Sequence, residues 1–236
     1  MIKYEDVVLQ ESDIDTLRGP CFLTDKVIEF YFAYLASTYK TDAVQLVEPS
    51  MSYWLAHCDQ VEASSFAESH KLSTKSLVLF VVNDCDGSCE GDSGSHWSTL
   101  VYNRSMNSFI HYDTMEGVNH LAAMDLYEAV KSHMGSGGQV SKKSRDKKKS
   151  ARSVCKPSVC KPPVFSEGKD IPQQSNGYDC GLYVLAIAEA ICHWFVDEMN
   201  TQVDLLSAVA EQVDHSVESQ MRGNVLGIIQ KVGIGS

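Results

Sequence analysis

The feature that most constrains this chain is a segment from Cys180 to about Met199 that is apolar on almost all sides. Its large apolar residues do not follow a single stripe, so a helix formed here cannot lie on the surface. The sequence therefore predicts a buried helix that the rest of the chain surrounds. The turn-forming pair Asn176-Gly177 precedes this segment and indicates where the helix begins.

Cys180 lies in the first turn of the predicted helix. Unpaired backbone N–H groups and the helix dipole favour negative charge at such a position. They therefore favour the thiolate, which is the nucleophilic form of cysteine. A single cysteine at a helix start is more often a buried core residue, because free cysteines are among the most buried side chains. Other segments of the chain decide between these two interpretations.

Two strand-like runs, one beginning at His96 and the other ending at Asp113, flank a short polar segment and predict a β-hairpin. A turn centred between Arg104 and Ser105 places His96 directly opposite Asp113. Cβ atoms in such a pair are about 5 Å apart, which lets a carboxylate hold an imidazole N–H. A register shift of one residue would instead put the two side chains on opposite faces.

Length and composition indicate one domain. With 236 residues and 44% apolar content, the chain can bury a sizeable core, and we expect a single domain over 1–236. No apolar segment with basic flanks follows the polar N-terminus, so we expect no secretion. The apolar run Leu77 to Val82 indicates a buried strand and is too short to span a bilayer. The eight cysteines are then expected to be reduced thiols in a cytoplasmic or nuclear protein.

A basic segment interrupts an otherwise acidic chain. Between Lys142 and Glu167, nine basic residues against two acidic ones give a local charge of +7. The net charge of the whole chain is −11, so the remaining residues together carry a charge of −18. Such an acidic body repels nucleic acid and favours a basic protein partner. Segment 135–163 has few large apolar residues, and we expect a disordered insertion there. A lysine run can also bind nucleic acid or direct nuclear import, but a solvated tail is commoner.

Two pairs of cysteines, Cys85 with Cys89 and Cys155 with Cys160, are spaced like pairs of zinc ligands. Neither has a second pair at zinc-finger spacing. We therefore expect no metal site, and no residue pattern indicates another cofactor.

The order of His96-Trp97, Asp113 and Gln174-x5-Cys180 along the chain resembles that of the ubiquitin-like-protein-specific cysteine proteases, the sentrin-specific protease family. The resemblance runs from about residue 4 to residue 191, with the basic insertion outside it. It implies an α+β fold of the papain-like, ubiquitin-like-protease type. In this fold helices flank a central mixed sheet, and a buried helix begins at the nucleophile.

Further segments carry the same resemblance. Phe22-Leu23-Thr24-Asp25 is similar to the family's Trp-Leu-Asn-Asp segment, and Tyr178-Asp179-Cys180-Gly181 matches its nucleophile turn. Within the family, the chain looks most like the deneddylase branch. Three features favour this branch: an N-terminal arm (Tyr4, Asp6, Leu9, Ser12, Asp13), the run from Phe32 to Ala36, and the run from His111 to Thr114.

The resemblance implies catalytic roles for four residues. Cys180 is the nucleophile, and His96 is the general base that ionises it, or the two rest as a thiolate and imidazolium pair. Asp113 holds the imidazole tautomer and orientation, as in other triads recognised by role. The side-chain amide of Gln174 and the backbone N–H of Cys180 stabilise the oxyanion.

Three further residues are expected to contact the substrate. Trp97 roofs a narrow tunnel that admits only the Gly-Gly terminus of a ubiquitin-like protein, if the resemblance holds. Phe22 replaces the family's first tryptophan and alters the size of the clamp over the substrate tail. Asp25 either pairs with a basic residue of the modifier or caps the helix that begins there.

The resemblance implies a cysteine protease that cleaves after the Gly-Gly of the neddylation (Rub) modifier, both in precursors and in lysine conjugates. A deSUMOylating protease is the alternative enzyme, because the tail tunnel is common to the family. A non-catalytic binder of a ubiquitin-like protein is the alternative outside catalysis. We expect a monomer whose partners are the modifier and its conjugates, with no membrane and no nucleic acid among them.

Overall fold

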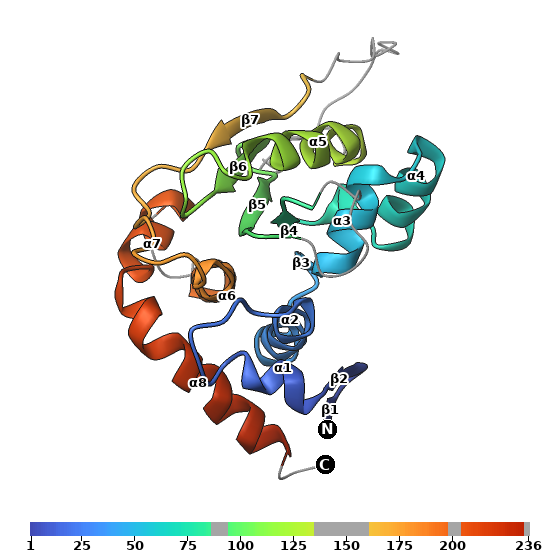
Figure 1. The fold of residues 1–236 in the computed structure, drawn as a ribbon. Helices are drawn as coiled ribbons and strands as arrows, with labels where there is room; N and C mark the ends of the chain where they lie inside the picture. The colour runs from blue at the N-terminus through green and yellow to red at the C-terminus, as the bar shows by residue number, and fades with distance from the viewer. Residues whose placement is uncertain (86–93, 135–160, 198–203, 234–236) are drawn as a thin grey trace, which may run out of the picture.

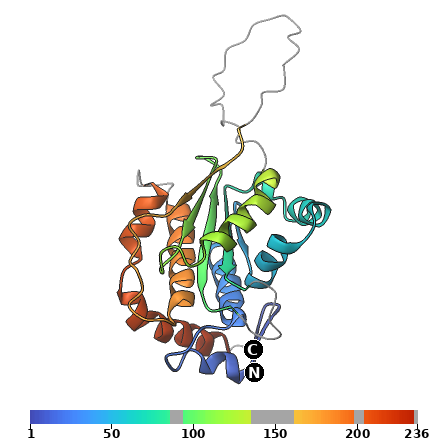
Figure 2. The ribbon, with the colours of Figure 1, turned by 45° about the horizontal axis from the view of Figure 1, so that its top comes forward.

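The computed structural model describes residues 1–85, 94–134, 161–197 and 204–233, and its centre is a five-stranded sheet (Figure 1 and Figure 2). The two central pairings are antiparallel, and each outer strand runs parallel to its neighbour, which makes the sheet mixed. The strand order is β3 (Val44–Val47), β4 (Leu77–Asn83), β5 (Trp97–Asn103), β6 (Ser108–Tyr112) and β7 (Val164–Glu167).

Helices cover both faces of this sheet. One face carries α3 (Pro49–His57), α4 (Gln60–Ser69) and α5 (His120–Val130), and the other carries α2 (Asp25–Tyr39) and α6 (Cys180–Asp197). Outside α6 lie α7 (Leu205–Gln212) and α8 (Ser216–Gly233). The remaining elements are the short helix α1 (Glu11–Asp15), the hairpin β1 (Ile2–Tyr4) and β2 (Val7–Leu9), and 3-10 turns at Leu72–Thr74 and Lys131–His133.

Side chains of the central strands alternate between two cores, as the two-residue period of a strand requires. In β4, Leu79 and Val81 pack with α2 and α6, whereas Val78 and Phe80 pack with α3, α4 and α5. All four are almost completely buried. This explains why the predicted strand at 77–82 is continuously apolar: helices cover it on both faces.

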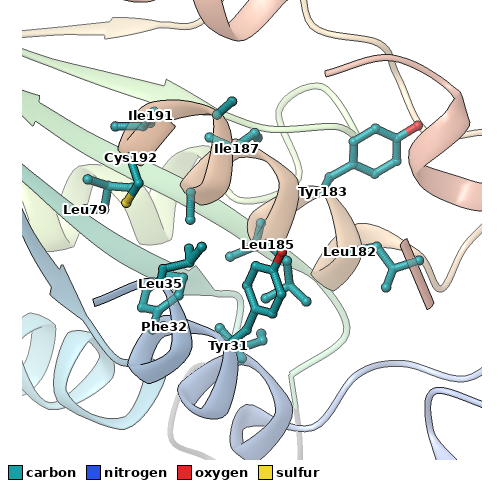
Figure 3. Packing of buried hydrophobic residues seen from close by; sticks show 14 of the residues in the cluster. Tyr31, Phe32, Leu35, Leu79, Leu182, Tyr183, Leu185, Ile187, Ile191 and Cys192 are labelled. Atoms are coloured by element: carbon teal, nitrogen blue, oxygen red, sulfur yellow. The ribbon is translucent and has the colours of Figure 1, made fainter. Parts of the chain in front are cut away.

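The predicted buried helix is α6, which begins at Cys180 as expected. Figure 3 shows its side chains packed against Tyr31, Phe32 and Leu35 of α2 and against Leu79 of β4. Burial of each large apolar side chain stabilises the fold by about 1.5–3 kcal/mol. By length and composition α6 could cross a membrane, but 72% of it is buried inside the protein, as in a core helix. This helix thereby fixes the depth of Cys180 in the molecule.

Two further elements expected from the sequence are present in the structure. The predicted helix at Pro49 is α3, and the expected hairpin is formed by β5 and β6. The predicted insertion at 135–163 lies outside the described residues except for 161–163, so its disorder stays a prediction.

Candidate active site

The turn before α6 is built by the side chain of Asn176. Its Oδ1 accepts the backbone N–H groups of Tyr178 and Asp179, each at 3.0 Å, and its Nδ2 donates to Asp179 Oδ2 at 2.8 Å. The carbonyl of Asp179 then accepts from Leu182 N at 2.9 Å, which starts the helix. Cys180 is thus the first residue of α6, where a backbone N–H has no partner within the helix.

His96 and Asp113 contact each other directly. His96 Nε2 donates to Asp113 Oδ1 at 2.6 Å, and both side chains are almost fully buried. His96 Nδ1 is buried and has no hydrogen-bond partner in the part of the chain that the structure describes. Nδ1 is therefore the ring nitrogen that remains for Cys180.

The register that predicted this pair is wrong by two residues. The structure pairs Asn103 with Ser108 and Thr99 with Tyr112, so the turn is centred one residue later than expected. Continuing this register places position 98 across from Asp113. A shift of two residues keeps His96 and Asp113 on the same face, as diagonal neighbours within reach of each other. The predicted contact is therefore present although the predicted direct pairing is not.

The surroundings of His96 favour the protonated form of its imidazole. Burial of the ring opposes its charge, but the hydrogen bond to Asp113 and the interaction with the Cys180 sulfur outweigh burial and raise the pKa of His96 to about 9. An interaction of this kind requires the ring to be near the sulfur, although His96 Nδ1 makes no hydrogen bond within the described residues. Cys180 itself is 1% exposed. The three side chains therefore form one contiguous group at the start of α6.

Backbone donors hold the carboxylate of Asp113. Its Oδ1 accepts Met115 N–H and its Oδ2 accepts Asn119 N–H, each at 3.0 Å. Burial would raise the pKa of Asp113, but the hydrogen bonds from His96 and from these two N–H groups lower it. Asp113 is thus an anion that is oriented before any substrate arrives.

Asn119 is a site residue that the sequence analysis missed. It is fully buried, and its Nδ2 lies 3.2 Å from the carbonyl of His96, 3.3 Å from that of Val82 and 2.9 Å from Ser98 Oγ. It therefore contacts the segments of both His96 and Asp113. Its one sequence signal is its position before helix α5, where asparagine is an ordinary cap.

Gln174 lies between the loop after β6 and the nucleophile turn. Its backbone N–H donates to the Thr114 carbonyl at 2.9 Å, and its Oε1 accepts from the Thr114 hydroxyl at 2.8 Å. Its Nε2 donates to the Asn176 carbonyl at 2.5 Å. A primary amide has two N–H groups, so one remains for another acceptor. Gln174 thus lies just before the nucleophile turn, and its side-chain amide is held by the Thr114 hydroxyl and by the Asn176 carbonyl.

The three predicted substrate residues share one cleft of about 630 Å³. Phe22, Asp25 and Trp97 line it together with residues of the chain before α2 and of α3. The indole N–H of Trp97 donates to the Leu23 carbonyl at 3.1 Å, and Phe22 is 47% exposed. Trp97 directly follows His96 in the chain and lines the cleft, whereas the buried side chains of His96, Asp113 and Cys180 are not part of its lining.

Asp25 is the first residue of α2, and Thr24 holds the N-cap position. Asp25 is therefore not at the N-cap position, but its carboxylate accepts an N–H of the first helical turn, whereas Thr24 makes no side-chain cap bond. The Asp25 carboxylate accepts only the adjacent Lys26 N–H at 2.8 Å in the described structure, and it faces the cleft lining.

No group of three His, Cys, Asp or Glu residues within the described ranges is arranged to hold a metal ion. Of the two cysteine pairs, only Cys85 lies in those ranges.

Comparison with known proteins places these observations in context. The family model described as "Ulp1 protease family, C-terminal catalytic domain" matches residues 21–223. NEDD8-specific protease 1 of Arabidopsis thaliana is 35% identical over 98% of this chain and 93% of its own length. Sentrin-specific protease 8 of Homo sapiens is 30% identical over 88% of each chain.

Solved structures share the fold. The C-terminal Ulp1 protease domain in complex with Smt3, the yeast ortholog of SUMO, matches with a TM-score of 0.61 at 14% identity, over 98% of this chain and 86% of that chain. The Xanthomonas campestris effector XopD bound to ubiquitin matches with a TM-score of 0.57 at 17% identity, over 96% of each chain. The expected α+β fold is therefore confirmed.

Proposed function

This chain belongs to the Ulp1 family of cysteine peptidases, and from that premise we propose that it cleaves after the C-terminal Gly-Gly of the neddylation modifier. Both bond types would be substrates: the peptide bond of a precursor tail and the isopeptide bond to a lysine of a conjugate. The observation that carries the proposal is the position of His96, held by Asp113 through Nε2 and beside the Cys180 sulfur with Nδ1 free.

In the first half of the reaction, Cys180 loses its proton to His96 Nδ1, and the thiolate attacks the carbonyl carbon of the terminal glycine. Negative charge then develops on the carbonyl oxygen. The backbone N–H of Cys180 and the remaining N–H of Gln174 are the candidate donors to it. Loss of one such donor typically costs on the order of 10²–10³ in rate. When the C–N bond breaks, His96 returns the proton from Nδ1 to the leaving amine and a thioester remains.

In the second half, neutral His96 takes a proton from water through Nδ1, and the resulting hydroxide attacks the thioester. The same two donors stabilise the second oxyanion. The C–S bond breaks, the Cys180 sulfur leaves as thiolate, and the modifier departs with a free carboxylate. Asp113 stays an anion throughout and stabilises the imidazolium whenever it forms.

The choice of modifier rests on the relatives and on the cleft. Two relatives at 30% identity or more are named as acting on NEDD8 or as sentrin-specific protease 8. Asp25 and Trp97 line the same cleft, which supports a role for the Asp25 carboxylate in attracting a basic residue of the modifier tail. We also propose that the protein is a monomer.

A panel of activity probes tests the proposal. The neddylation modifier, SUMO and ubiquitin, each with a C-terminal thiol-reactive group, are incubated separately with the wild type, Cys180→Ala and Cys192→Ala. We expect the neddylation probe to label the wild type and Cys192→Ala but not Cys180→Ala. Cys192 is a matched control because it is a buried cysteine of the same helix whose pKa burial raises to about 12.

Each other outcome has a defined meaning. Labelling by the SUMO probe alone would favour the deSUMOylating alternative, and labelling of Cys180→Ala would remove the nucleophile assignment. A wild type that binds the neddylation modifier tightly and yet reacts with no probe would be a non-catalytic binder.

A further inference from the structure

A second chain of hydrogen bonds leads from the His96 and Asp113 pair to the opposite edge of the hairpin. Its central member is His111 of β6, which is fully buried. His111 Nδ1 contacts Glu167 Oε2 of β7 at 2.8 Å, and His111 Nε2 contacts Ser98 Oγ of β5 at 2.9 Å. Neither His111 nor Glu167 has a role in the proposed reaction.

When the His111 ring is neutral, the partners fix the direction of each hydrogen bond in this chain. A carboxylate only accepts, so the His111 proton lies on Nδ1 and points at Glu167. In the neutral ring Nε2 then accepts, and the Ser98 hydroxyl donates to it. Ser98 Oγ in turn accepts from Asn119 Nδ2 at 2.9 Å. The amide of Asn119 cannot be reversed, because Nδ2 also contacts two main-chain carbonyls, which only accept.

The inner end of the chain contacts both members of the proposed catalytic pair. Asn119 donates its backbone N–H to Asp113 Oδ2 at 3.0 Å and its side-chain N–H to the His96 carbonyl at 3.2 Å. A change in the orientation of Asn119 would therefore move the carboxylate and the backbone that carries the imidazole. Asn119 Oδ1 is buried and has no hydrogen-bond partner among the described residues, so the orientation of Asn119 is set by the bonds of its two N–H-bearing nitrogens.

The outer end reaches the surface of the protein. The Glu167 side chain is 44% exposed, and its second oxygen accepts from His120 Nδ1 at 2.6 Å. Partial burial opposes its charge, but the hydrogen bonds from His111 and His120 lower the pKa of Glu167. Glu167 is thus the anion that selects the tautomer of His111.

We propose that Glu167, His111, Ser98 and Asn119 form a positioning relay that orients the His96 and Asp113 pair from the edge strand β7. These are positioning residues, because they act through Asp113 and His96 and do not contact the cleft. The inference rests on the proposed function for its kinetic readout only. Its spectroscopic readout needs no substrate. A failure of the positioning relay can therefore be told from a failure of the proposed protease function.

Two substitutions open the relay at different points, and each has a matched control. Ser98→Ala removes the hydroxyl between Asn119 and His111. Its control is Ser108→Ala on the same hairpin, since Ser108 Oγ is buried and has no hydrogen-bond partner within the described residues. Glu167→Gln replaces the anion at the outer end. Its control is His120→Ala, which removes the other partner of Glu167 and leaves the bond to His111 in place.

The first measurement is steady-state cleavage of a fluorogenic neddylation-modifier substrate. We expect Ser98→Ala and Glu167→Gln to lower kcat about tenfold, because small misplacements of reacting groups cost that much or more. KM should stay within twofold of the wild-type value, since the substrate cleft is unchanged. Both controls should keep the kcat and the KM of the wild type.

The second measurement is the NMR signal of the His96 Nε2 proton in the substrate-free protein, with labelled histidine. We expect this signal to shift or broaden in Ser98→Ala and Glu167→Gln, and to stay unchanged in Ser108→Ala and His120→Ala. The proposal is overturned if the relay variants keep the wild-type signal, or if their activity falls only in proportion to the folded fraction measured by circular dichroism.

Discussion

Arg222 of α8 forms an ion pair with Asp179, the residue directly before Cys180, with Nη2 2.5 Å from Oδ1. The same guanidinium donates to the carbonyls of Thr16 at 2.5 Å and Cys21 at 2.8 Å. One side chain from the C-terminal helix therefore joins the nucleophile turn to the segment that carries Phe22. This arrangement makes α8 a support of the site, although it lies outside the sheet and its covering helices.

Arg222→Ala would leave the carboxylate of Asp179, whose side chain is only 3% exposed, without its ionic partner. Breaking a buried pair in this way typically lowers the free energy of unfolding by about 3–5 kcal/mol. We expect a loss of that size in urea unfolding, together with slower alkylation of Cys180 in the folded protein. Arg18→Ala is the control, since its pairs with Glu11 and Asp15 are exposed, and it should cause little change. Equal losses in both variants would contradict this role of Arg222.

Asp113→Asn should lower kcat by on the order of 10³–10⁴, because an amide cannot select the tautomer of His96 or stabilise its charged form. The carboxylate is a principal cause of the raised pKa of His96, about 9, so the histidine should titrate at lower pH in the variant. Following the His96 Cε1 proton by NMR against pH checks this. A His96 titration unchanged by the substitution would show that Asp113 does not hold the imidazolium.

The same shift predicts how stability depends on pH. The pKa of His96 is raised from 6.5 to about 9 on folding, so its protonation favours the folded state. This contribution is complete below about pH 6.5 and is lost as the pH rises through about 9. The difference in unfolding free energy between the wild type and Asp113→Asn should therefore shrink from pH 6.5 to pH 9. Urea unfolding across this range measures it, and a difference that grows with pH would be inconsistent.

The sequence was sufficient for the residues whose positions follow from local patterns. The apolar run after Cys180 predicted the buried helix and its start. The alternation of the hairpin put His96 and Asp113 on one face, even with the register wrong by two residues. The error has a local cause: Asn103 Oδ1 accepts the backbone N–H groups of Ser105 and Met106, and Asn107 adopts a left-handed conformation with φ of 48°. These contacts move the centre of the turn.

Residues that act through long-range contacts could not be found in this way. Arg222 lies 43 residues from Asp179 along the chain, and Glu167 lies 56 residues from His111. Each reads locally as an ordinary charged residue near the surface, because its partner is brought to it only by the packing of α8 or the pairing of β7 with β6. Periodicity reports which face a residue occupies, and it carries no information on which distant element will cover that face.

Phe22→Ala separates substrate binding from folding. The ring is 47% exposed and lines the cleft, so its removal costs little packing but takes away a contact with the substrate tail. We expect KM for the modifier substrate to rise about tenfold, the effect of losing one apolar contact of 1–2 kcal/mol, with kcat and the melting temperature unchanged. Met106→Ala, which is 56% exposed at the hairpin turn, is the control and should change neither constant. An unchanged KM in Phe22→Ala would place the tail elsewhere.

Gly181→Ala tests whether the nucleophile turn and the cleft are mechanically linked. A Cβ at Gly181 would lie 3.0 Å from Leu23 Cβ and 3.1 Å from Leu23 Cγ, closer than carbon atoms normally approach. Leu23 has to move, and its carbonyl accepts the Trp97 indole N–H. We expect the substitution to lower the free energy of unfolding by about 1–3 kcal/mol, as overpacking does, and to raise KM through Trp97.

Gly177→Ala is the matched control within the same turn. A Cβ there meets no atom within 4 Å, and the backbone φ of Gly177 is not positive, so a methyl group should be accepted without loss of stability or activity. Thermal unfolding and steady-state kinetics of the two variants decide the question. Equal losses would mean that the turn needs glycine for its flexibility. A loss confined to Gly181→Ala would mean that the close approach of α6 to Leu23 sets the position of Trp97 over the cleft.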